Sequence, residues 1–143
     1  MTMRTLLEGK TKETMTVAAT ETMLAAVQKM LEAKVGALLV IGDTNAPIGI
    51  LTERDVLRFC GQRADKLASI PVSDVMTKDL VVGTLETSVD EAQVLMTQNK
   101  FRHLPIVDEG KIIGIVSIGD LVKARLRETA VEVKYLRDFI AMN

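Results

Sequence analysis

Two short segments of the chain each carry a hydroxyl residue and an aspartate three positions apart. Thr52 precedes Asp55 and Ser117 precedes Asp120, both within a Gly-x-x-[Thr/Ser]-x-x-Asp segment. Each segment follows an apolar run and leads into a helix-like stretch, so the hydroxyl and the carboxylate are expected at the same helix end. There the carboxylate can accept both hydrogen bonds of a ribose 2′,3′-diol, while the hydroxyl and the first-turn N–H groups can hold phosphate. The pattern therefore indicates nucleotide binding.

The same spacing has a second interpretation, because Thr-x-x-Asp is also an ordinary helix-capping pattern. In that case each carboxylate bonds to its own backbone and binds no ligand. The presence of two copies in one chain favours ribose binding at one or both positions. The glycines that open the segments, Gly49 and Gly114, would let a neighbouring strand or a ligand approach the backbone closely.

The two motifs belong to a longer internal repeat. They align at a shift of 65 residues, and the match continues upstream at a shift of 66, where residues 38–41 fall on 104–107. The one-residue difference lies between residues 40 and 48, in a polar turn at 42–47, and the second copy has a tighter turn at 108–110. A duplication of this extent predicts two similar structural units with two similar sites.

Composition limits the possible partners. The net charge is −1 with both signs mixed along the chain, so no basic stripe is available for nucleic acid. No apolar run approaches a membrane span, and the N-terminus lacks the long apolar segment of a signal peptide. Cys60 is the one cysteine, which suits a reducing compartment. We therefore expect a cytoplasmic protein with no nucleic-acid or membrane partner.

An enzyme is the function class with the least support. No nucleophile-elbow sequence precedes any serine, and no Walker-type Gly-rich loop with lysine is present. His103 is the only histidine, so the chain lacks a zinc ligand set and no metal is expected. The paired aspartates each have a binding role and no obvious acid–base partner.

Apolar periodicity predicts the same order of elements in both repeats. After a lead-in at 1–14, with one helical turn at 5–8, the first repeat is expected to contain a strand at 15–17, a helix capped by Thr22 through about Lys34, a hairpin at 37–41 and 48–51, and a helix from Thr52 to Gly61. The second repeat is expected to contain a strand at 80–82, a helix opened by a Ser88–Glu91 capping box, a hairpin at 103–107 and 112–116, and a last helix from near Ser117. The connecting segment 68–77 should be held to the core by Val75 and Met76.

The tail from 121 to 142 is longer than its counterpart in the first repeat. Its apolar residues recur at threes and fours, as in a helix: Leu121, Val122, Leu126, Val133, Leu136 and Ile140. This helix could pack on its own domain or on another subunit. Its length beyond the repeat favours another subunit.

These ordered motifs resemble those of the CBS domain, and the chain looks like a stand-alone tandem CBS pair. The matching segments are 34–40 with 49–57, 101–107 with 114–122, and Val-Met-Thr at 75–77. The resemblance implies an α+β fold, in which two β-α-β-β-α repeats pack sheet to sheet with pseudo-two-fold symmetry and a long C-terminal helix follows. The implied boundaries are 10–66 for repeat 1, 67–78 for the linker, 79–127 for repeat 2 and 128–143 for the C-terminal helix.

The resemblance also implies two clefts between the repeats that can hold adenosine ligands such as AMP, ADP, ATP, S-adenosylmethionine or NAD. Each cleft would draw on both repeats. Phe101, Arg102 and His103 would join the Asp55 site. Val35, Gly36 and Ala37 would join the Asp120 site.

These assignments make the two sites chemically different and leave some residues with two roles. Arg102 offers forked donors to phosphate, whereas the small residues assigned to the other site suit an adenine face. Arg54 could reach phosphate or pair with a nearby carboxylate. His103 could touch phosphate or satisfy a backbone carbonyl. Lys10 could contact the ligand or remain solvated.

The predicted function is that of a non-catalytic regulatory sensor. AMP, ADP, ATP or NAD would bind between the repeats and change the angle or assembly of a homodimer, which requires different affinities for two states. An S-adenosylmethionine sensor is the less supported variant. The alternative class is a structural module that dimerises or docks a partner while its sites serve only as helix caps. The sequence names no downstream protein target.

Overall fold

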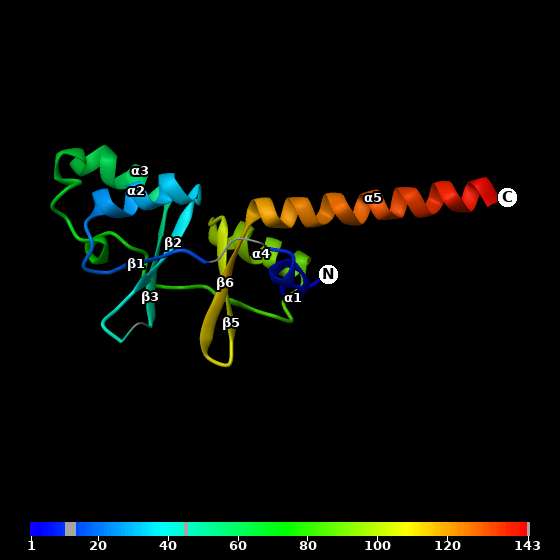
Figure 1. Ribbon diagram of the computed structural model, residues 1–143, viewed down its shortest axis with the longest axis horizontal. Coiled ribbons are helices and arrows are strands. Elements are labelled where there is room, and N and C mark those ends of the chain that lie inside the picture. The colour runs from blue at the N-terminus through cyan, green and yellow to red at the C-terminus, as the bar shows by residue number, and fades with distance from the viewer. Residues whose placement is uncertain (11–13, 45, 143) are drawn as a thin grey trace. The chain divides into compact units, whose positions relative to one another are not determined.

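The computed structural model describes residues 1–143 except 11–13, 45 and 143 (Figure 1). The chain divides into two compact units. The first-repeat unit is Lys12–Leu80, and the second-repeat unit combines Met1–Thr11 with Val81–Asn143. Each unit contains a three-stranded sheet, ordered β1-β2-β3 in one and β4-β5-β6 in the other. The predicted α+β fold with two related sheets and a long C-terminal helix is confirmed.

The first-repeat unit has the predicted order of elements: β1 Thr16–Ala18, α2 Met23–Ala33, β2 Ala37–Ile41, β3 Pro47–Thr52 and α3 Glu53–Arg63. Strand β2 is central, parallel to β1 and antiparallel to β3. Thr22 caps α2 by accepting a hydrogen bond from the Ala25 N–H at 3.1 Å. The helix ends where Lys34 adopts a left-handed conformation with φ 56°.

The connecting segment after α3 packs on this same unit. Two short 3₁₀ turns follow α3, η1 Ala64–Lys66 and η2 Val72–Asp74, and the Val72 side chain is fully buried. Val75 and Met76 pack against the first-repeat core, as predicted. Thr77 forms an antiparallel bridge to Ile50, with both N–H···O distances at 2.9 Å.

Gly49 is required for this contact, because the segment lies directly on strand β3. A Cβ atom at Gly49 would stand 2.7 Å from Met76 Sδ and 2.9 Å from the Thr77 carbonyl oxygen. The glycine that opens the first motif therefore admits a neighbouring strand, which is one of the two approaches that the sequence predicted.

The second-repeat unit repeats this arrangement with α1 Met3–Glu8, β4 Gly83–Thr84, α4 Val89–Asn99, β5 His103–Asp108, β6 Lys111–Ser117 and α5 Ile118–Met142. Strand β5 is central, parallel to β4 and antiparallel to β6. The predicted capping box of α4 is present, with Ser88 Oγ accepting from the Glu91 N–H at 3.0 Å. Lys100, at φ 57°, ends α4 as Lys34 ends α2.

Several boundaries differ from the sequence prediction, and helix α1 begins two residues before the expected turn at 5–8. The strand expected at 80–82 lies instead at Gly83–Thr84, because the backbone at Gly83 packs closely against the central strand β5. A Cβ atom there would stand 3.0 Å from Leu104 Cδ2. Helix α3 does not close at Gly61 but continues to Arg63, since space is open around Gly61 and one helical glycine costs only about 1 kcal/mol. Strand β1 begins at Thr16, one residue later than expected.

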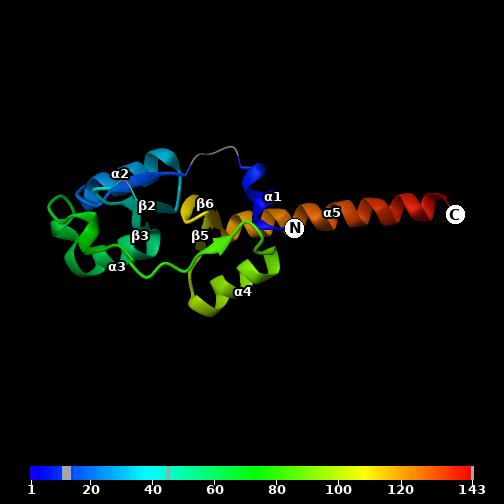
Figure 2. The same cartoon turned by 90° about the horizontal axis from the view of Figure 1, so that it is seen from below.

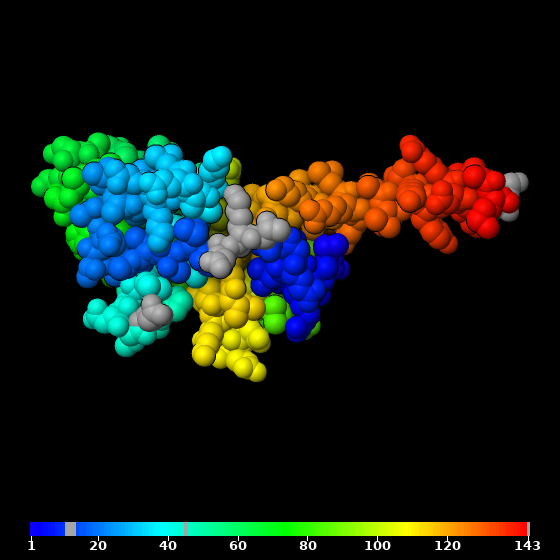
Figure 3. All heavy atoms as spheres, viewed as in Figure 1, coloured from blue at the N-terminus to red at the C-terminus, as the bar shows by residue number. Residues whose placement is uncertain are grey.

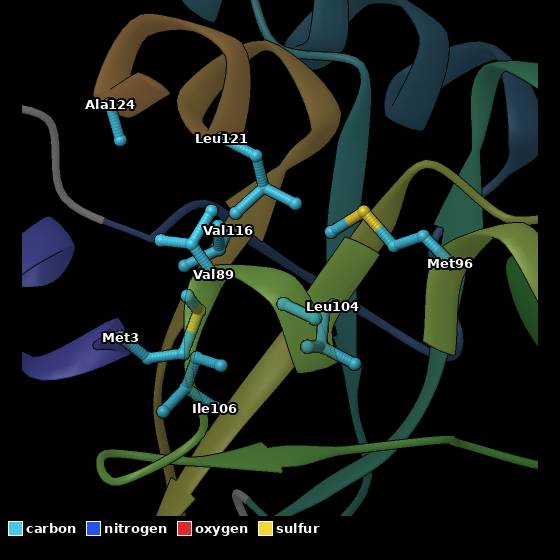
Figure 4. Close-up of a cluster of buried hydrophobic side chains, with 9 residues drawn as sticks. Met3, Val89, Met96, Leu104, Ile106, Val116, Leu121 and Ala124 are labelled. Carbon is cyan, nitrogen blue, oxygen red and sulfur yellow. The ribbon is translucent and has the colours of Figure 1, made fainter. Parts of the chain in front are cut away.

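The N-terminal segment is part of the second core, which the sequence did not predict. Met3 is fully buried and reaches from α1 into a cluster that comprises Val89, Ala92, Met96, Leu104, Ile106, Val116, Leu121 and Ala124 (Figure 4). The backbone also bonds this segment, through Met3 N–H to Thr87 O at 2.9 Å and Arg4 N–H to Leu85 O at 3.0 Å. Each unit is thus completed by the segment that precedes the first strand of the other repeat.

Helix α5 packs on its own unit only near its beginning. Leu121 and Ala124 are its buried residues among those described, and the helix then extends past α1 and α4 in both views (Figures 1 and 2). On the face shown in Figure 3, no other described part of this unit covers the red end of the helix. Packing of α5 on its own domain therefore holds for the first turns alone. Among the described residues, no helix is both long and apolar enough to cross a membrane.

Candidate functional site at two helix starts

The first motif forms a complete helix cap at the beginning of α3. The Thr52 N–H donates to Asp55 Oδ2 at 3.0 Å, and the Asp55 N–H donates to Thr52 Oγ1 at 3.4 Å. The Thr77 hydroxyl adds contacts to Asp55 Oδ1 at 3.2 Å and to Oδ2 at 3.4 Å. Asp55 is 7% exposed. Both of its carboxylate oxygens are therefore already used inside the first-repeat unit.

The second motif forms the same cap at the beginning of α5 but leaves more of its aspartate available. The Ser117 N–H donates to Asp120 Oδ2 at 2.8 Å, and the Asp120 N–H donates to Ser117 Oγ at 3.1 Å. The Lys10 ammonium also donates to Oδ2, at 3.1 Å. No described residue donates a hydrogen bond to Asp120 Oδ1, and the side chain is 20% exposed.

Lys10 is fixed in place by two contacts in the second-repeat unit. Its ammonium donates to the Ile115 carbonyl oxygen at 2.6 Å as well as to Asp120. Residue 10 aligns with Met76 at the repeat shift of 66, so Lys10 lies on β6 much as the segment containing Met76 and Thr77 lies on β3. The residue that aligns with Thr77 is Thr11, which lies outside the described residues, so the described contact that adds to the second cap is the Lys10 ammonium.

The environment of Asp120 lowers the pKa of its carboxyl group. Burial by itself would raise this pKa, but the hydrogen bond from the Ser117 N–H and the hydrogen bond and charge of Lys10 together have the larger effect. Because the folded-state pKa is the lower one, the stabilisation is complete above the unfolded-state value of about 3.9. It disappears as the pH falls through the folded-state value.

We expect Lys10→Met to lower the free energy of unfolding by about 0.5–1 kcal/mol at pH 7 through loss of the ion pair. The part of this loss that comes from the charge should shrink as the pH falls below about 4, because the carboxylate is then being protonated. Urea denaturation from pH 7 to pH 2 measures it. Lys29→Met is the matched control, since Lys29 donates to the Thr16 carbonyl oxygen and its loss should not vary with pH in this range. A Lys10→Met effect that is constant across the same range would contradict the ion-pair role.

The helix-start amides are partly occupied by the preceding loops of the same repeat. The Glu53 N–H donates to Gly36 O at 3.1 Å, and the Ile118 N–H donates to Arg102 O at 2.8 Å. Among the described residues, the Gly119 N–H has no acceptor in the first turn of α5. A phosphate would therefore meet fewer open amides than the sequence suggested.

These geometries agree with comparisons to known proteins. The family model described as CBS domain matches residues 10–61 and 72–127, which include both motifs and both hairpins. The chain belongs to the CBS domain family.

The CBS relatives include proteins of similar and of greater length. The chain is 40% identical over 124 residues to the mitochondrial CBS domain-containing protein CBSX3 of Arabidopsis thaliana, an alignment that covers 84% of this chain but 60% of that protein. A CBS-domain containing protein from Agrobacterium tumefaciens has 35% sequence identity and a TM-score of 0.81, with 87% of this chain and 92% of that chain covered. CBSX2, solved in complex with AMP, has 30% identity and a TM-score of 0.72, with coverages of 90% and 98%.

Within each CBS repeat, the predicted loop residues lie beside the helix start of their own repeat. Ala37 pairs in register with Thr52, and His103 pairs with Ser117. Val35 packs on the first core and Phe101 on the second. The assignment of each loop to the aspartate of the other repeat stays a prediction.

The predicted cations differ in how they are placed. Arg54 and Arg102 are exposed, and His103 is half-buried at the beginning of β5. Sequence reasoning missed the contact of Thr77 with Asp55, and it left Lys10 as either a ligand contact or a solvated residue without foreseeing its ion pair with Asp120. The repeat register was the available signal, because it aligns the segment 9–11 with 75–77. Among the described residues, no group of three or more His, Cys, Asp or Glu is placed to hold a metal ion.

Proposed function

We propose that this CBS protein is a non-catalytic regulatory module that binds an adenine nucleotide, AMP, ADP, ATP or NAD, and that Asp120 accepts the ribose hydroxyls. The observation that carries the proposal is that the two oxygens of the Asp120 carboxylate have different contacts. Oδ2 caps the helix and pairs with Lys10, while no described residue donates to Oδ1. A partly exposed, ionised oxygen at a helix start is a suitable acceptor for a sugar diol.

The neighbours of Asp120 fit the rest of such a ligand. Lys10 places a positive charge within 3.1 Å of the carboxylate, and the Gly119 N–H at the helix start adds a donor for a negatively charged group. The site thus has a cation that the sequence assignment of Val35, Gly36 and Ala37 lacked. We keep those three residues as the proposed adenine-facing group.

Asp55 has a mainly structural role in this proposal. Its oxygens are occupied by Thr52 and Thr77, and the residue is buried. A ligand at this position would have to replace the Thr77 contact. Arg54, Phe101, Arg102 and His103 remain proposed contacts of this second, weaker site, with Arg102 assigned to phosphate.

The related CBSX2–AMP complex supports the choice of an adenine nucleotide, at 30% sequence identity over most of both chains. Regulation then requires that the bound and free states differ in structure or assembly, because a ligand shifts an equilibrium only through different affinities. We propose a homodimer as the assembly that responds. The cytoplasm is the proposed compartment.

A thermal-shift panel with AMP, ADP, ATP, NAD and S-adenosylmethionine tests the proposal. At about 100 times its dissociation constant, a ligand that binds only the folded state stabilises it by roughly 2.7 kcal/mol. For a chain of this size that corresponds to a rise in Tm of roughly 5–10 °C. No rise with any of the five ligands would exclude the sensor function.

A structural module is the competing function, and one specific observation favours it. Both motifs form local helix caps, so the geometry accounts for their residues without a ligand. A module of this kind would dimerise or dock a partner and would give no response in the ligand panel. This alternative leaves unexplained why no described residue donates to Asp120 Oδ1.

A further inference from the structure

The outer part of α5 exposes many large apolar side chains. Its exposed large apolar residues are Leu126, Val131, Val133, Tyr135, Leu136, Phe139, Ile140 and Met142. In proteins, most of the stability of a helix comes from the packing of its apolar face and not from helix propensity. The helix therefore needs a partner along the part that extends past α1 and α4 (Figures 1 and 2).

One stripe of this surface has the spacing of a coiled coil. Its positions follow one another at intervals of 4, 3, 4, 3 and 4: Val122, Leu126, Thr129, Val133, Leu136 and Ile140. At 100° per residue, the centre of this stripe lies roughly 130° around the helix from Leu121 and Ala124, which face the core of the unit. A partner can therefore cover the stripe while the first turns stay in place.

We propose that this stripe pairs with the same stripe of a second copy of the chain, in a parallel, in-register, two-stranded coiled coil. The a positions are Leu126, Val133 and Ile140, and the d positions are Val122, Thr129 and Leu136. Leu136 at d beside Val133 and Ile140 at a is the arrangement that favours two strands. The other d residues, Val122 and Thr129, are β-branched and do not add to this preference.

The charges beside the stripe select the parallel orientation. Glu132 occupies a g position and Arg137 the e position that follows it in the next heptad. In a parallel pair, Glu132 of each copy meets Arg137 of the other. In an antiparallel pair, the e positions face one another and bring Lys123 against Arg137, which is repulsive. Arg125, also at g, is held by Asp90 and Gln93 of its own α4 and meets Ala130 of the second copy in the parallel pair.

Light scattering during gel filtration tests the assembly in the full chain, and circular dichroism confirms that each variant remains folded. Wild type should have twice the 15.6 kDa chain mass. Val133→Glu and Leu136→Glu should reduce the mass to that of one chain at the same concentration. Val131→Glu is the matched control, because Val131 is also exposed, at 69%, but lies outside the stripe, and it should leave the dimer intact.

Any of three results would overturn the proposal. The first is a monomeric wild type, which is also the outcome if the first-repeat unit of the same chain covers the stripe. The second is a dimer that survives Val133→Glu. The third is a dimer that Val131→Glu dissociates as well as Val133→Glu does. Because the assay contains no nucleotide, its outcome bears on the proposed homodimer but not on whether Asp120 binds a nucleotide, which the ligand panel tests separately.

Disulfide formation and charge exchange test the orientation. In a Cys60→Ser background, Thr129→Cys and Leu136→Cys should each give a covalent dimer on mild oxidation, since in-register parallel helices place both positions opposite themselves. An antiparallel pair permits at most one of the two. Glu132→Arg should raise the dissociation constant about fivefold, and adding Arg137→Glu should restore it. Crosslinking at only one position, or no recovery in the double variant, would exclude the parallel arrangement.

Discussion

Met3→Ala is expected to lower the free energy of unfolding by about 2–5 kcal/mol, the range for truncation of a buried Met. Met3 is fully buried although it lies in the first turn of the first helix, and its side chain fills space between Val89, Ile106 and neighbouring residues (Figure 4). The truncation leaves a cavity that the short helix α1 can close only in part. Urea denaturation followed by circular dichroism measures the loss, since the chain has no Trp and a single Tyr.

A second methionine provides the control for this change. Met142 is 85% exposed, so Met142→Ala removes the same atoms from solvent-facing surface and should change the free energy of unfolding by less than about 0.5 kcal/mol. If Met3→Ala changed the free energy of unfolding as little as Met142→Ala, the N-terminal segment would not be part of the folded core. A large effect would show that residues preceding one repeat stabilise the unit built around the other.

The repeat made most of the fold predictable. Capping residues at Thr22 and Ser88, apolar helix faces and continuous apolar strands all carry local signals, and the structure places helices and hairpins where those signals are. The shortest elements were the least well predicted: β4 was misplaced and α1 was predicted to begin two residues late, because two and six residues are too few for a periodicity. The burial of Met3 depends on contacts with residues more than 80 positions away and has no local signal.

The sites were predictable in their residues but not in their partners. The sequence places Thr52 with Asp55 and Ser117 with Asp120, and both pairs bond to one another as expected. The sequence does not tell which oxygen each cap uses, and it does not bring Lys10 to Asp120 across 110 residues. These long-range contacts make two copies of one motif chemically different.

Asp120→Ala is expected to weaken AMP binding roughly 10- to 150-fold, which corresponds to the 1.5–3 kcal/mol of hydrogen bonds to a charged group. The substitution removes the acceptor proposed for the ribose hydroxyls. It also removes the acceptor of the Ser117 N–H and the ion pair with Lys10, at a cost of about 1–3 kcal/mol of stability, while the Ser117 hydroxyl can still cap the helix, so the variant should remain folded. Isothermal titration of AMP into wild type and variant measures the change, after thermal unfolding has confirmed that both are native at the temperature used.

Asp55→Ala is the matched comparison, and it should affect stability more strongly than AMP affinity. It leaves the Thr52 N–H and the Thr77 hydroxyl without their acceptor in a buried site, which costs about 1–3 kcal/mol of stability. Its effect on AMP affinity should be under about threefold, because both of its oxygens are already occupied within the protein. If the two variants lose equal affinity, the two sites are not distinguished by Asp120 Oδ1, to which no described residue donates. If only Asp55→Ala loses affinity, the nucleotide binds at the first repeat through replacement of the Thr77 contact.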